Sequence, residues 1–405
     1  MDFSLTDDQR LIRDTVRQFM EAEVRPLIRQ YDREEKFPEA ELRKLGEMGC
    51  CGMLVPEEWG GAGLDTLSYV LMLEEVARVD AATAVALSVT NSVAGYPLCA
   101  HGTAAQKGRY LPRLSRGEIL GAFCLTEPQA GSDSAAIQAR AARHGGFYRL
   151  NGTKTWVSNG GVAGLYLVFA KTDVEAGSRG VTAFLVEPSF PGFRVSRYED
   201  KMGLRTSRSA EIVFTDCEVP AQNRLGEEGQ GLKIALEALD GGRVGIAAQA
   251  VGIAQGAFEE AVRYAKQRRA FGKTIGEFQA IQWMLADMHT EIEAARCLTH
   301  YAAWLRDRGA SRLGPSASRA KLYASEMVNR VVYKAVQIHG SVGYSRETDV
   351  ERMYRDARVI SIYEGTSEIQ RMIIARDLLG SSGGARAALA AAPREAADAR
   401  VKGGG

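Results

Sequence analysis

One stretch of this chain places a carboxylate beside a glycine, an arrangement that could do acid–base chemistry. Glu364 ends an apolar run, VISIY at 359–363, and Gly365 follows it directly. A carboxylate among apolar side chains is costly to bury as a charge, so its pKa tends to rise toward that of a useful base. Thr366 can cap the next helix, whose free N–H groups suit an anion. Taken alone, the stretch is equally consistent with an exposed glutamate before an ordinary cap.

Two other stretches offer hydroxyls and a flat ring to a ligand. LTEPQAGSD leaves a predicted strand at Leu125 and enters a loop that carries Ser132. Such a loop presents hydroxyls and free N–H groups, although by itself it is more typical of a plain surface turn. TKTWVSNGG places Trp156 and Ser158 on a short predicted strand, where an indole can fill a core or stack on a planar ring.

Three stretches in predicted helices carry unusual residues. DGGR at 240–243 puts two glycines inside a helix, at a cost of roughly 1 kcal/mol each relative to alanine. That cost is easier to understand if a group lies against this face, although a helix break or close helix packing would also explain it. QRRAFGK at 267–273 is either a solvated helix end or a pyrophosphate clamp. QIHGSVGY at 337–344 lacks the strand–GxGxxG–helix unit, so a Rossmann nucleotide site is rejected.

Composition limits the possible classes of protein. At 405 residues, two or three domains are expected, and 45% hydrophobic with 25% charged residues is ordinary for a globular protein. The net charge of +1 gives no support to a nucleic-acid or membrane-surface partner. No apolar run approaches membrane-spanning length, and the acidic start MDFSLTDDQR resembles neither a signal nor a transit peptide. The six cysteines form no C-x-x-C pair, which favours reduced thiols in the cytoplasm and no metal site.

The periodicity divides the chain into three parts and a tail. Residues 1–120 read as helical, with capping boxes at Thr6 and Thr103. Residues 121–229 read as an antiparallel β-barrel or sandwich, with strands at 122–125, 147–150, 153–157, 165–170, 181–186 and 211–214 and a hairpin at Asn151-Gly152. Residues 230–380 predict a four-helix bundle with helices at 230–270, 277–308, 315–339 and 366–379. The Ala/Gly-rich tail, 381–405, predicts a flexible extension.

Taken together, LTEPQAGSD, NGTKTWVSNG, QRRAFGK with Gln279, QIHGSVGY and IYEGTSEIQ resemble the acyl-CoA dehydrogenase family, in order, from about residue 5 to 380. The likeness to its short-chain and branched-chain members is strongest. The resemblance implies a multidomain α+β fold, helical then β then helical. It also implies FAD in each subunit of a homotetramer built as a dimer of dimers, and an electron-transferring flavoprotein as the acceptor.

The resemblance also implies a role for each matching residue. Glu364 matches the catalytic base. The positions that match contacts to the subunit's own flavin are Phe123, Leu125, Thr126, Ser132, Trp156 and Ser158. The positions that match contacts to a neighbouring subunit's FAD are Arg268, Phe271, Gln279, Gln337, Ile338, Gly340, Ser341, Thr366 and Glu368. The positions that match substrate contacts are Ser132, Asp240, Arg243, Glu364 and Gly365.

The implied reaction is α,β-dehydrogenation of an acyl-CoA thioester to the 2-enoyl-CoA. A base must remove the weakly acidic α-proton, while the flavin accepts the β-hydride. Some family members carry the base at the position of Gly242, which cannot serve, so the role falls to Glu364. No basic residue occurs at 80–89, where decarboxylating glutaryl-CoA dehydrogenases carry an arginine. The acyl group stays open among straight short-chain, branched, aryl-substituted and other dicarboxylic forms.

Other classes compete with this interpretation. A di-iron bundle needs Glu-x-x-His pairs, which the chain lacks. An acyl-CoA oxidase would share the fold and pass electrons to oxygen, and sequence separates it poorly from a dehydrogenase. A non-catalytic nucleic-acid-binding member of the superfamily would need a basic surface, which the net charge does not support.

Overall fold

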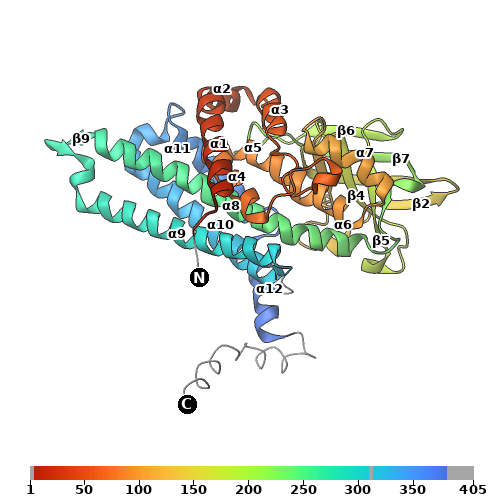
Figure 1. Ribbon diagram of the computed structural model, residues 1–405. Coiled ribbons are helices and arrows are strands. Elements are labelled where there is room, and N and C mark those ends of the chain that lie inside the picture. Colours follow the sequence, from red (N-terminus) through yellow and green to blue (C-terminus); the bar gives the residue numbers. More distant parts are fainter. Residues whose placement is uncertain (1–3, 310–312, 381–405) are drawn as a thin grey trace, which may run out of the picture.

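The computed structural model describes residues 4–309 and 313–380. The order of elements is helical, then β, then helical, which confirms the predicted sequence of parts (Figure 1). The predicted extension at 381–405 lies outside the described residues.

The N-terminal part is helical, and both predicted capping boxes are present. Thr6 caps α1 (Asp7–Phe19) and Thr103 caps α7 (Ala104–Ser115). Between them lie η1 (Met20–Val24), α2 (Arg25–Glu34), α3 (Glu39–Glu47), η2 (Glu57–Trp59), α4 (Thr66–Val79), α5 (Ala81–Ser88), η3 (Val89–Gly95) and α6 (Tyr96–His101). Segments α4, α5 and η3 are buried almost throughout and pack against α8, so they form one wall of the region around that helix.

The middle part is one eight-stranded sheet in the order β6-β7-β3-β2-β4-β5-β8, with β1 also paired to β4. The strands are β1 (Gly121–Cys124), β2 (Arg140–His144), β3 (Phe147–Ser158), β4 (Leu165–Lys171), β5 (Val181–Val186), β6 (Phe193–Tyr198), β7 (Ser209–Pro220) and β8 (Arg224–Leu225). Short 3-10 turns are η4 (Ser134–Ala136), η5 (Gly177–Gly180) and η6 (Ala221–Asn223). An apolar cluster on this sheet includes Ile234 and Ala235, which shows that the start of α8 packs against it.

Of the predicted barrel or sandwich, the barrel is wrong, because the strand pairing is an open path that ends at β6 and β8. The pairing is also not wholly antiparallel, since β4 pairs in parallel with β1 and with β2. Neither end strand is suited to closure. Strand β8 has only two residues, and β6 exposes Arg194 and Arg197, and such short or charged edges discourage further pairing.

The predicted hairpin at Asn151-Gly152 is also wrong. Both residues lie inside the continuous strand β3, and the hairpin turn is at Gly145-Gly146, between β2 and β3. Gly152 instead marks a register shift against β7, with a φ of 147°. Asn151 exchanges two hydrogen bonds with Asp216 of β7, at 3.0 and 2.8 Å, so its amide fixes an irregularity in the ladder.

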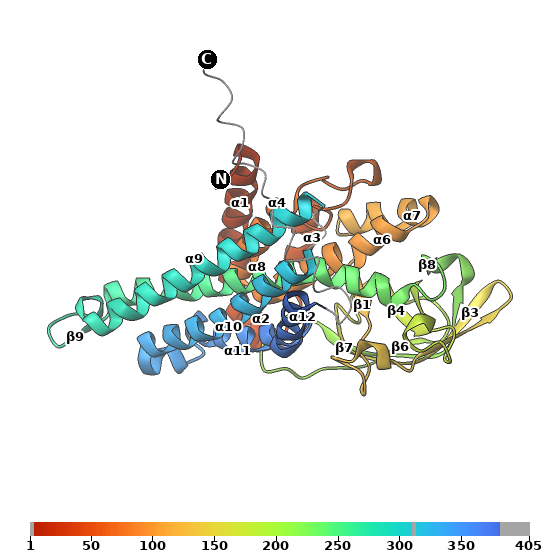
Figure 2. The same cartoon turned by 90° about the horizontal axis from the view of Figure 1, so that it is seen from below.

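The C-terminal part contains the four predicted helices and one more. They are α8 (Gly231–Gln267), α9 (Gln279–Asp307), α10 (Leu313–His339) and α12 (Ser367–Leu379), with the unpredicted α11 (Asp349–Ala357). Connecting pieces are β9 (Arg269–Ala270), β10 (Lys273–Thr274), η7 (Ile275–Glu277), η8 (Gly340–Tyr344) and η9 (Arg358–Ser361). Seen from below, α8, α9 and α10 run alongside one another, with the sheet at one end and β9 at the other (Figure 2).

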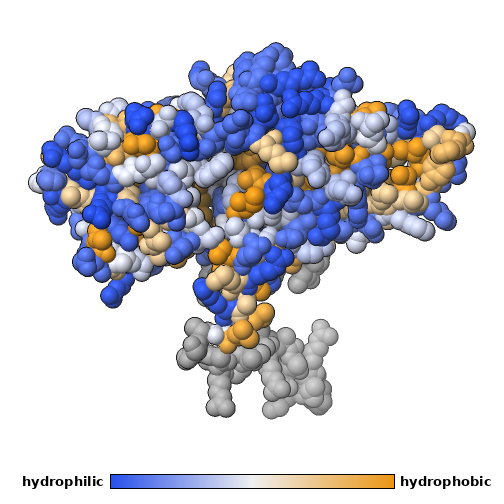
Figure 3. All heavy atoms as spheres, turned by 180° about the vertical axis from the view of Figure 1, so that it is seen from behind, coloured by the Kyte–Doolittle hydropathy of each residue, from blue (hydrophilic) through white to orange (hydrophobic). Residues whose placement is uncertain are grey.

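Helix α12 projects from the body of the molecule and shows apolar side chains near its end (Figure 3). Met372, Leu378 and Leu379 are exposed there. Within residues 4–309 and 313–380, each helix is too short or too polar to cross a bilayer. The same ranges hold no group of three His, Cys, Asp or Glu side chains that could bind a metal.

Candidate active site

Two consecutive glycines of α8 let charged side chains reach the helix backbone. A β-carbon on Gly242 would stand 2.1 Å from Glu364 Oε2, and one on Gly241 would stand 2.3 Å from Arg306 Nη1. Both distances are far below van der Waals contact, so any larger residue would displace these groups. The helical glycines of the DGGR motif therefore allow close approach by side chains and do not break the helix.

The backbone at Glu364 is held in an uncommon conformation. The apolar run before it forms the 3-10 turn η9, and then Glu364 and Gly365 both adopt positive φ, 50° and 94°. A positive φ is unfavourable for glutamate and persists where the surroundings impose it. Lys321 Nζ and Gln370 Nε2 both donate to the Gly365 carbonyl, at 2.7 and 2.9 Å. These bonds fix the turn that aims the Glu364 side chain at Gly242.

Burial gives the Glu364 carboxyl the character of a base near neutral pH. Desolvation raises its pKa to about 7, against the opposing effect of the Lys321 and Arg243 cations. Its Oε2 atom is buried and has no hydrogen-bond partner among the described residues. Burial likewise lowers the pKa of Lys321 to about 8. The site thus holds a carboxyl that can change protonation state close to pH 7.

Asp240 and Arg243, which flank the two glycines in α8, form an ion pair with each other. Arg243 Nη1 donates to Asp240 Oδ1, and the arginine is almost fully buried. Burial raises the pKa of Asp240 and lowers the pKa of Arg243. Arg243 Nε is buried without a partner in the described structure. The pair therefore keeps one donor free beside Gly242.

The middle part of the chain with its eight-stranded sheet, called the β-domain from here on, brings the LTEP and TKTWVSN motifs together. Thr155 N donates to Thr126 O at 3.0 Å, so the end of β1 and the end of β3 are adjacent. A register shift between Lys154 and Val157 leaves Trp156 at a φ of 57° with 60% of its surface exposed. Such a bulge re-aims a side chain out of the sheet. The indole is thereby exposed at the surface and does not belong to the core.

The other predicted residues on this side differ in exposure. Phe123 is half-buried and packs on Phe169, with ring centroids 5.0 Å apart. Leu125 is buried, Ser158 is half-buried at the end of β3, and Ser132 is exposed in the loop after β1. The structure therefore places all of these residues in the β-domain, on the strands and loop that carry Trp156 and Thr126.

A buried ion pair supports the same loop, and sequence reasoning missed it. Lys154 is fully buried, and its Nζ donates to Glu127 Oε1 at 2.7 Å and to the Leu125 carbonyl at 3.1 Å. Glu127 also accepts from the N–H groups of Gln138 and Ala139. The alternation of β3 indicated that Lys154 points inward, which was the available signal.

The basic motif lies far from Glu364. Arg268 and Gln279 flank the β9–β10 hairpin, and Phe271 at its tip is 95% exposed. Gly242 and Gln267 are separated by 25 residues of one straight helix, or roughly 38 Å. Figure 1 shows this hairpin at the end of the molecule opposite the sheet. One subunit thus does not bring these residues to its own Glu364.

The residues of the QIHGSVGY motif lie near the basic hairpin and not near Glu364. His339, at the end of α10, stacks on Tyr264 of α8 with ring centroids 4.4 Å apart, which brings this end beside the last turns of α8. Gln337, Gly340 and Ser341 are exposed and Ile338 is buried. Thr366 caps α12 by accepting from Ile369 N at 3.4 Å, and Glu368 is exposed in its first turn.

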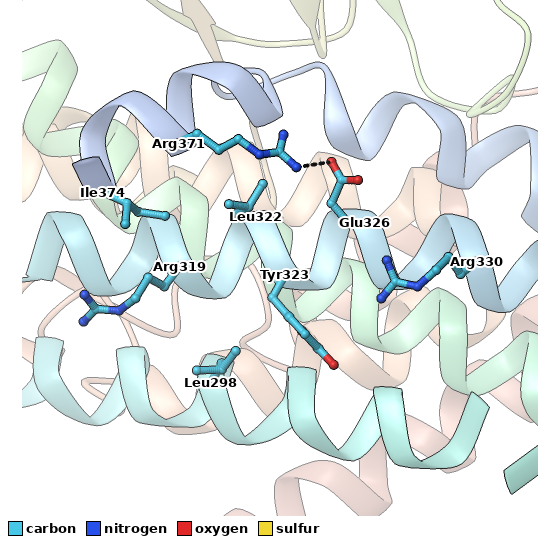
Figure 4. A pocket seen from close by; sticks show the side chains of 8 residues that line it. All are labelled: Leu298, Arg319, Leu322, Tyr323, Glu326, Arg330, Arg371 and Ile374. Carbon is cyan, nitrogen blue, oxygen red and sulfur yellow. Dashed lines mark ion pairs between the residues drawn. The ribbon is translucent and has the colours of Figure 1, made fainter. Parts of the chain in front are cut away.

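A separate groove of about 450 Å³ lies between α9, α10 and α12 (Figure 4). Arg371 pairs with Glu326 across it at 3.6 Å. It is lined by Leu298, Arg319, Leu322, Tyr323, Glu326, Arg330, Arg371 and Ile374. None of the predicted site residues lines this groove.

Comparison with known proteins agrees with this architecture. The acyl-CoA dehydrogenase N-terminal domain model matches residues 6–118, the middle domain model 122–217, and the C-terminal domain model 229–379. The chain belongs to the acyl-CoA dehydrogenase family, and it is an enzyme of the oxidoreductase class. The division at residues 120, 229 and 380 stays a prediction.

Several relatives are similar over most of their length. The protein "Acyl-CoA dehydrogenase, short-chain specific" of Clostridium acetobutylicum is 46% identical over 374 residues, covering 92% of this chain and 98% of that protein. Butyryl-CoA dehydrogenase from Megasphaera elsdenii has a TM-score of 0.92 at 45% identity, covering 94% of this chain and 100% of that chain. A chain in a structure described as "Electron transferring flavoprotein of Acidaminococcus fermentans" has a TM-score of 0.93 at 46% identity, with the same coverage.

Proposed function

We propose that this chain is an FAD-dependent dehydrogenase that converts an acyl-CoA thioester to its 2-enoyl-CoA, with Glu364 as the base. The observation that carries this proposal is the Glu364 carboxyl itself. Glu364 is half-buried, its Oε2 atom is buried and unpartnered, its pKa is about 7, and Oε2 stands against Gly242. A carboxylate in this state can accept a weakly acidic α-proton because burial favours its protonated form.

The chain's own residues prepare this step. The bonds from Lys321 and Gln370 hold the turn at Gly365, so the carboxylate keeps its direction when the proton arrives. Arg243 and Lys321 lie close enough to favour the charged form of Glu364 before the reaction. Asp240 and Arg243 together can bind polar groups of the CoA arm, since one guanidinium nitrogen remains unpartnered.

The residues of the β-domain fit a flavin. The exposed Trp156 indole offers a planar face, and Thr126 and Ser158 offer half-buried hydroxyls close to it in the chain and the sheet. Bound FAD would supply the acceptor for the hydride that leaves the substrate's β-carbon. The Lys154–Glu127 pair would keep the Leu125–Thr126 backbone in place against that ring.

The assembly that we infer is a homotetramer in which Arg268, Phe271, Gln279 and the end of α10 reach a neighbour's FAD, as do Thr366 and Glu368. Support comes from the roughly 38 Å of α8 between Gly242 and the basic hairpin. A cofactor held at one subunit's Trp156 would meet this hairpin only from another subunit. A cytoplasmic location remains our prediction.

The partner that we infer is an electron-transferring flavoprotein. The similarity to a chain in the Acidaminococcus structure supports it, as does the exposure of Trp156, which gives a partner access to the flavin side of the β-domain. Steady-state turnover with this flavoprotein, with a ferrocenium dye and with oxygen tests the inference. Slow oxygen use with fast transfer to the first two is expected, whereas rapid stoichiometric peroxide formation would identify an oxidase.

The assignment of the base is tested with Glu364→Gln. The amide preserves size but removes basicity, so anaerobic flavin bleaching across a panel of acyl-CoA thioesters should slow by at least about 10²-fold. FAD content and acyl-CoA affinity should remain within about twofold. Glu39→Gln, an exposed change on α3, is the matched control. Near-normal bleaching by a flavin-replete Glu364→Gln protein would refute the role of this residue.

A further inference from the structure

Arg306 lies in α9. None of the substrate contacts predicted from the sequence comes from that helix. Its Nη1 stands 2.3 Å from the position of a Gly241 β-carbon, and Glu364 Oε2 stands in the same relation to Gly242. Because these glycines are consecutive in α8, the guanidinium and the base reach the same turn of the helix. Arg306 therefore approaches α8 at the residue next to the one that Glu364 approaches.

The neighbours of Arg306 hold its guanidinium group in place but make no hydrogen bond to its Nη1 atom. Its guanidinium carbon lies 4.6 Å from the ring centroid of Tyr96, a cation–π contact. The next residue, Asp307, accepts from Thr66 N at 2.7 Å and so anchors the end of α9 to the start of α4. Nη1 itself is buried and has no hydrogen-bond partner in the part of the chain that the structure describes.

Unpartnered polar atoms gather around this pair of glycines. They are Arg306 Nη1, Arg243 Nε and Glu364 Oε2. Each buried polar atom without a partner costs about 1–3 kcal/mol, so native proteins keep few of them. A cluster of three, two of them donors on guanidinium groups that stay charged, indicates a ligand with oxygen acceptors.

The local charge agrees with such a ligand. Arg243, Arg306 and Lys321 bring three cations to this region. The facing carboxylates are Asp240, which pairs with Arg243, Asp307, which adjoins Arg306, and Glu364, which burial shifts toward its neutral form. An electron-rich oxygen that enters the site would be attracted by the two unpartnered guanidinium nitrogens, Arg306 Nη1 and Arg243 Nε.

We propose that Arg306 is a substrate-binding residue whose Nη1 donates a hydrogen bond to an oxygen of the bound acyl-CoA, an inference that rests on the function proposed above. Two oxygens share the required chemistry. One is an amide carbonyl of the pantetheine arm, and the other is an oxygen on the acyl group, such as a terminal carboxylate. The first would make Arg306 a general substrate anchor, and the second would make it a determinant of acyl specificity.

The experiment compares Arg306→Met, which removes the donors, with Arg306→Lys, which keeps the charge. Arg308→Met is the control, since Arg308 is exposed two residues further on and stacks on Trp304. Calorimetry on the FAD-loaded protein measures the affinity for two unreactive thioethers of CoA, one with a plain butyl group and one with a terminal carboxylate. Neither ligand can react, so affinity is read without turnover.

Arg306→Met should weaken binding about tenfold or more, which corresponds to the loss of about 1.4 kcal/mol, with partial recovery in Arg306→Lys. Equal loss for both thioethers identifies the pantetheine oxygen, and loss for the carboxylated one alone identifies the acyl oxygen. If Arg306→Met does not fold, Gly241→Ala displaces the guanidinium instead and should give the same loss.

Affinities within twofold of the wild type for both thioethers, in either variant, would overturn the inference about Arg306. A wild-type protein that binds neither thioether would instead overturn the proposed function. The two failures are therefore distinguishable in one set of titrations.

Discussion

The Glu364 carboxylate stands where the side chain of Gly242 would be, with Oε2 only 2.1 Å from the position of a β-carbon there. The Glu364 carboxylate thus occupies the space that the absent side chain of Gly242 leaves on α8. The identity of residue 242 decides whether a carboxylate from the turn before α12 can approach α8.

Gly242→Ala should lower kcat while leaving the fold intact. The added methyl must push the Glu364 carboxylate aside, and a displacement of about 1 Å in a catalytic group can cost on the order of 10²-fold in rate. Thermal unfolding and FAD content should change little. Gly146→Ala, at an open position between β2 and β3, is the control. Unchanged kcat in Gly242→Ala would show that the carboxylate position does not limit the reaction.

Activity should depend on pH through Glu364. The base works when deprotonated, so kcat/KM should fall as the pH drops below about 7. Lys321 lowers the pKa of Glu364, so Lys321→Met should raise that pKa and move the acidic limb of the profile to higher pH. Lys334→Met changes an ion pair on the same helix and should leave the limb in place. An identical limb in Lys321→Met would contradict this coupling.

Glu364 should also destabilise the protein above neutral pH. Its pKa is about 7 when folded against 4.5 as the reference value, so ionisation costs the folded state more than the unfolded state. The penalty is absent below pH 4.5, grows between the two values and is complete above about 7. Glu364→Gln should therefore gain roughly 1–3 kcal/mol in free energy of unfolding at pH 8 and little at low pH. Urea unfolding at several pH values measures it, and a difference that does not vary with pH would refute it.

Phe271→Ser should weaken assembly and flavin retention together. Phe271 is 95% exposed, so the substitution should change the stability of the isolated subunit by less than about 0.5 kcal/mol. If its ring contacts a neighbour's FAD, light scattering should show smaller species with a lower ratio of FAD to protein. Val174→Ser, exposed in the β-domain, is the control. Full FAD occupancy in dissociated Phe271→Ser subunits would count against the shared cofactor site.

The order of parts was predictable because hydrophobic period and capping are local properties. Thr6 and Thr103 cap their helices as expected, and the predicted helix 277–308 is α9 (Gln279–Asp307). Asn151-Gly152 failed as a hairpin because the pair of residues is stabilised by Asp216, more than sixty positions away in sequence. The Gly145-Gly146 pair was an equally local turn signal and is the one that the fold uses.

The candidate site divides in the same way. Glu364, Trp156 and the DGGR motif were identified from residue types, and the structure brings Glu364 and Gly242 together. Arg306 was missed because its contact with Gly241 depends on how α9 packs against α8, which no local pattern records. Lys154 was missed because strand alternation alone, which points it inward, does not outweigh the surface preference of lysine until its partner, Glu127, is known.

Helix α8 ties distant parts of the molecule into one mechanical unit. Its 37 residues span roughly 55 Å. Gly231 lies against the backbone of Thr182 in the sheet, and Gly252 lies against the Glu74 carbonyl of α4. A helix of the C-terminal domain that packs against both other family domains cannot fray at one end without loosening the packing at the other. Unfolding of the sheet would therefore disturb α8 and, through it, the β9–β10 hairpin at its far end. The three domains should consequently unfold in one cooperative transition.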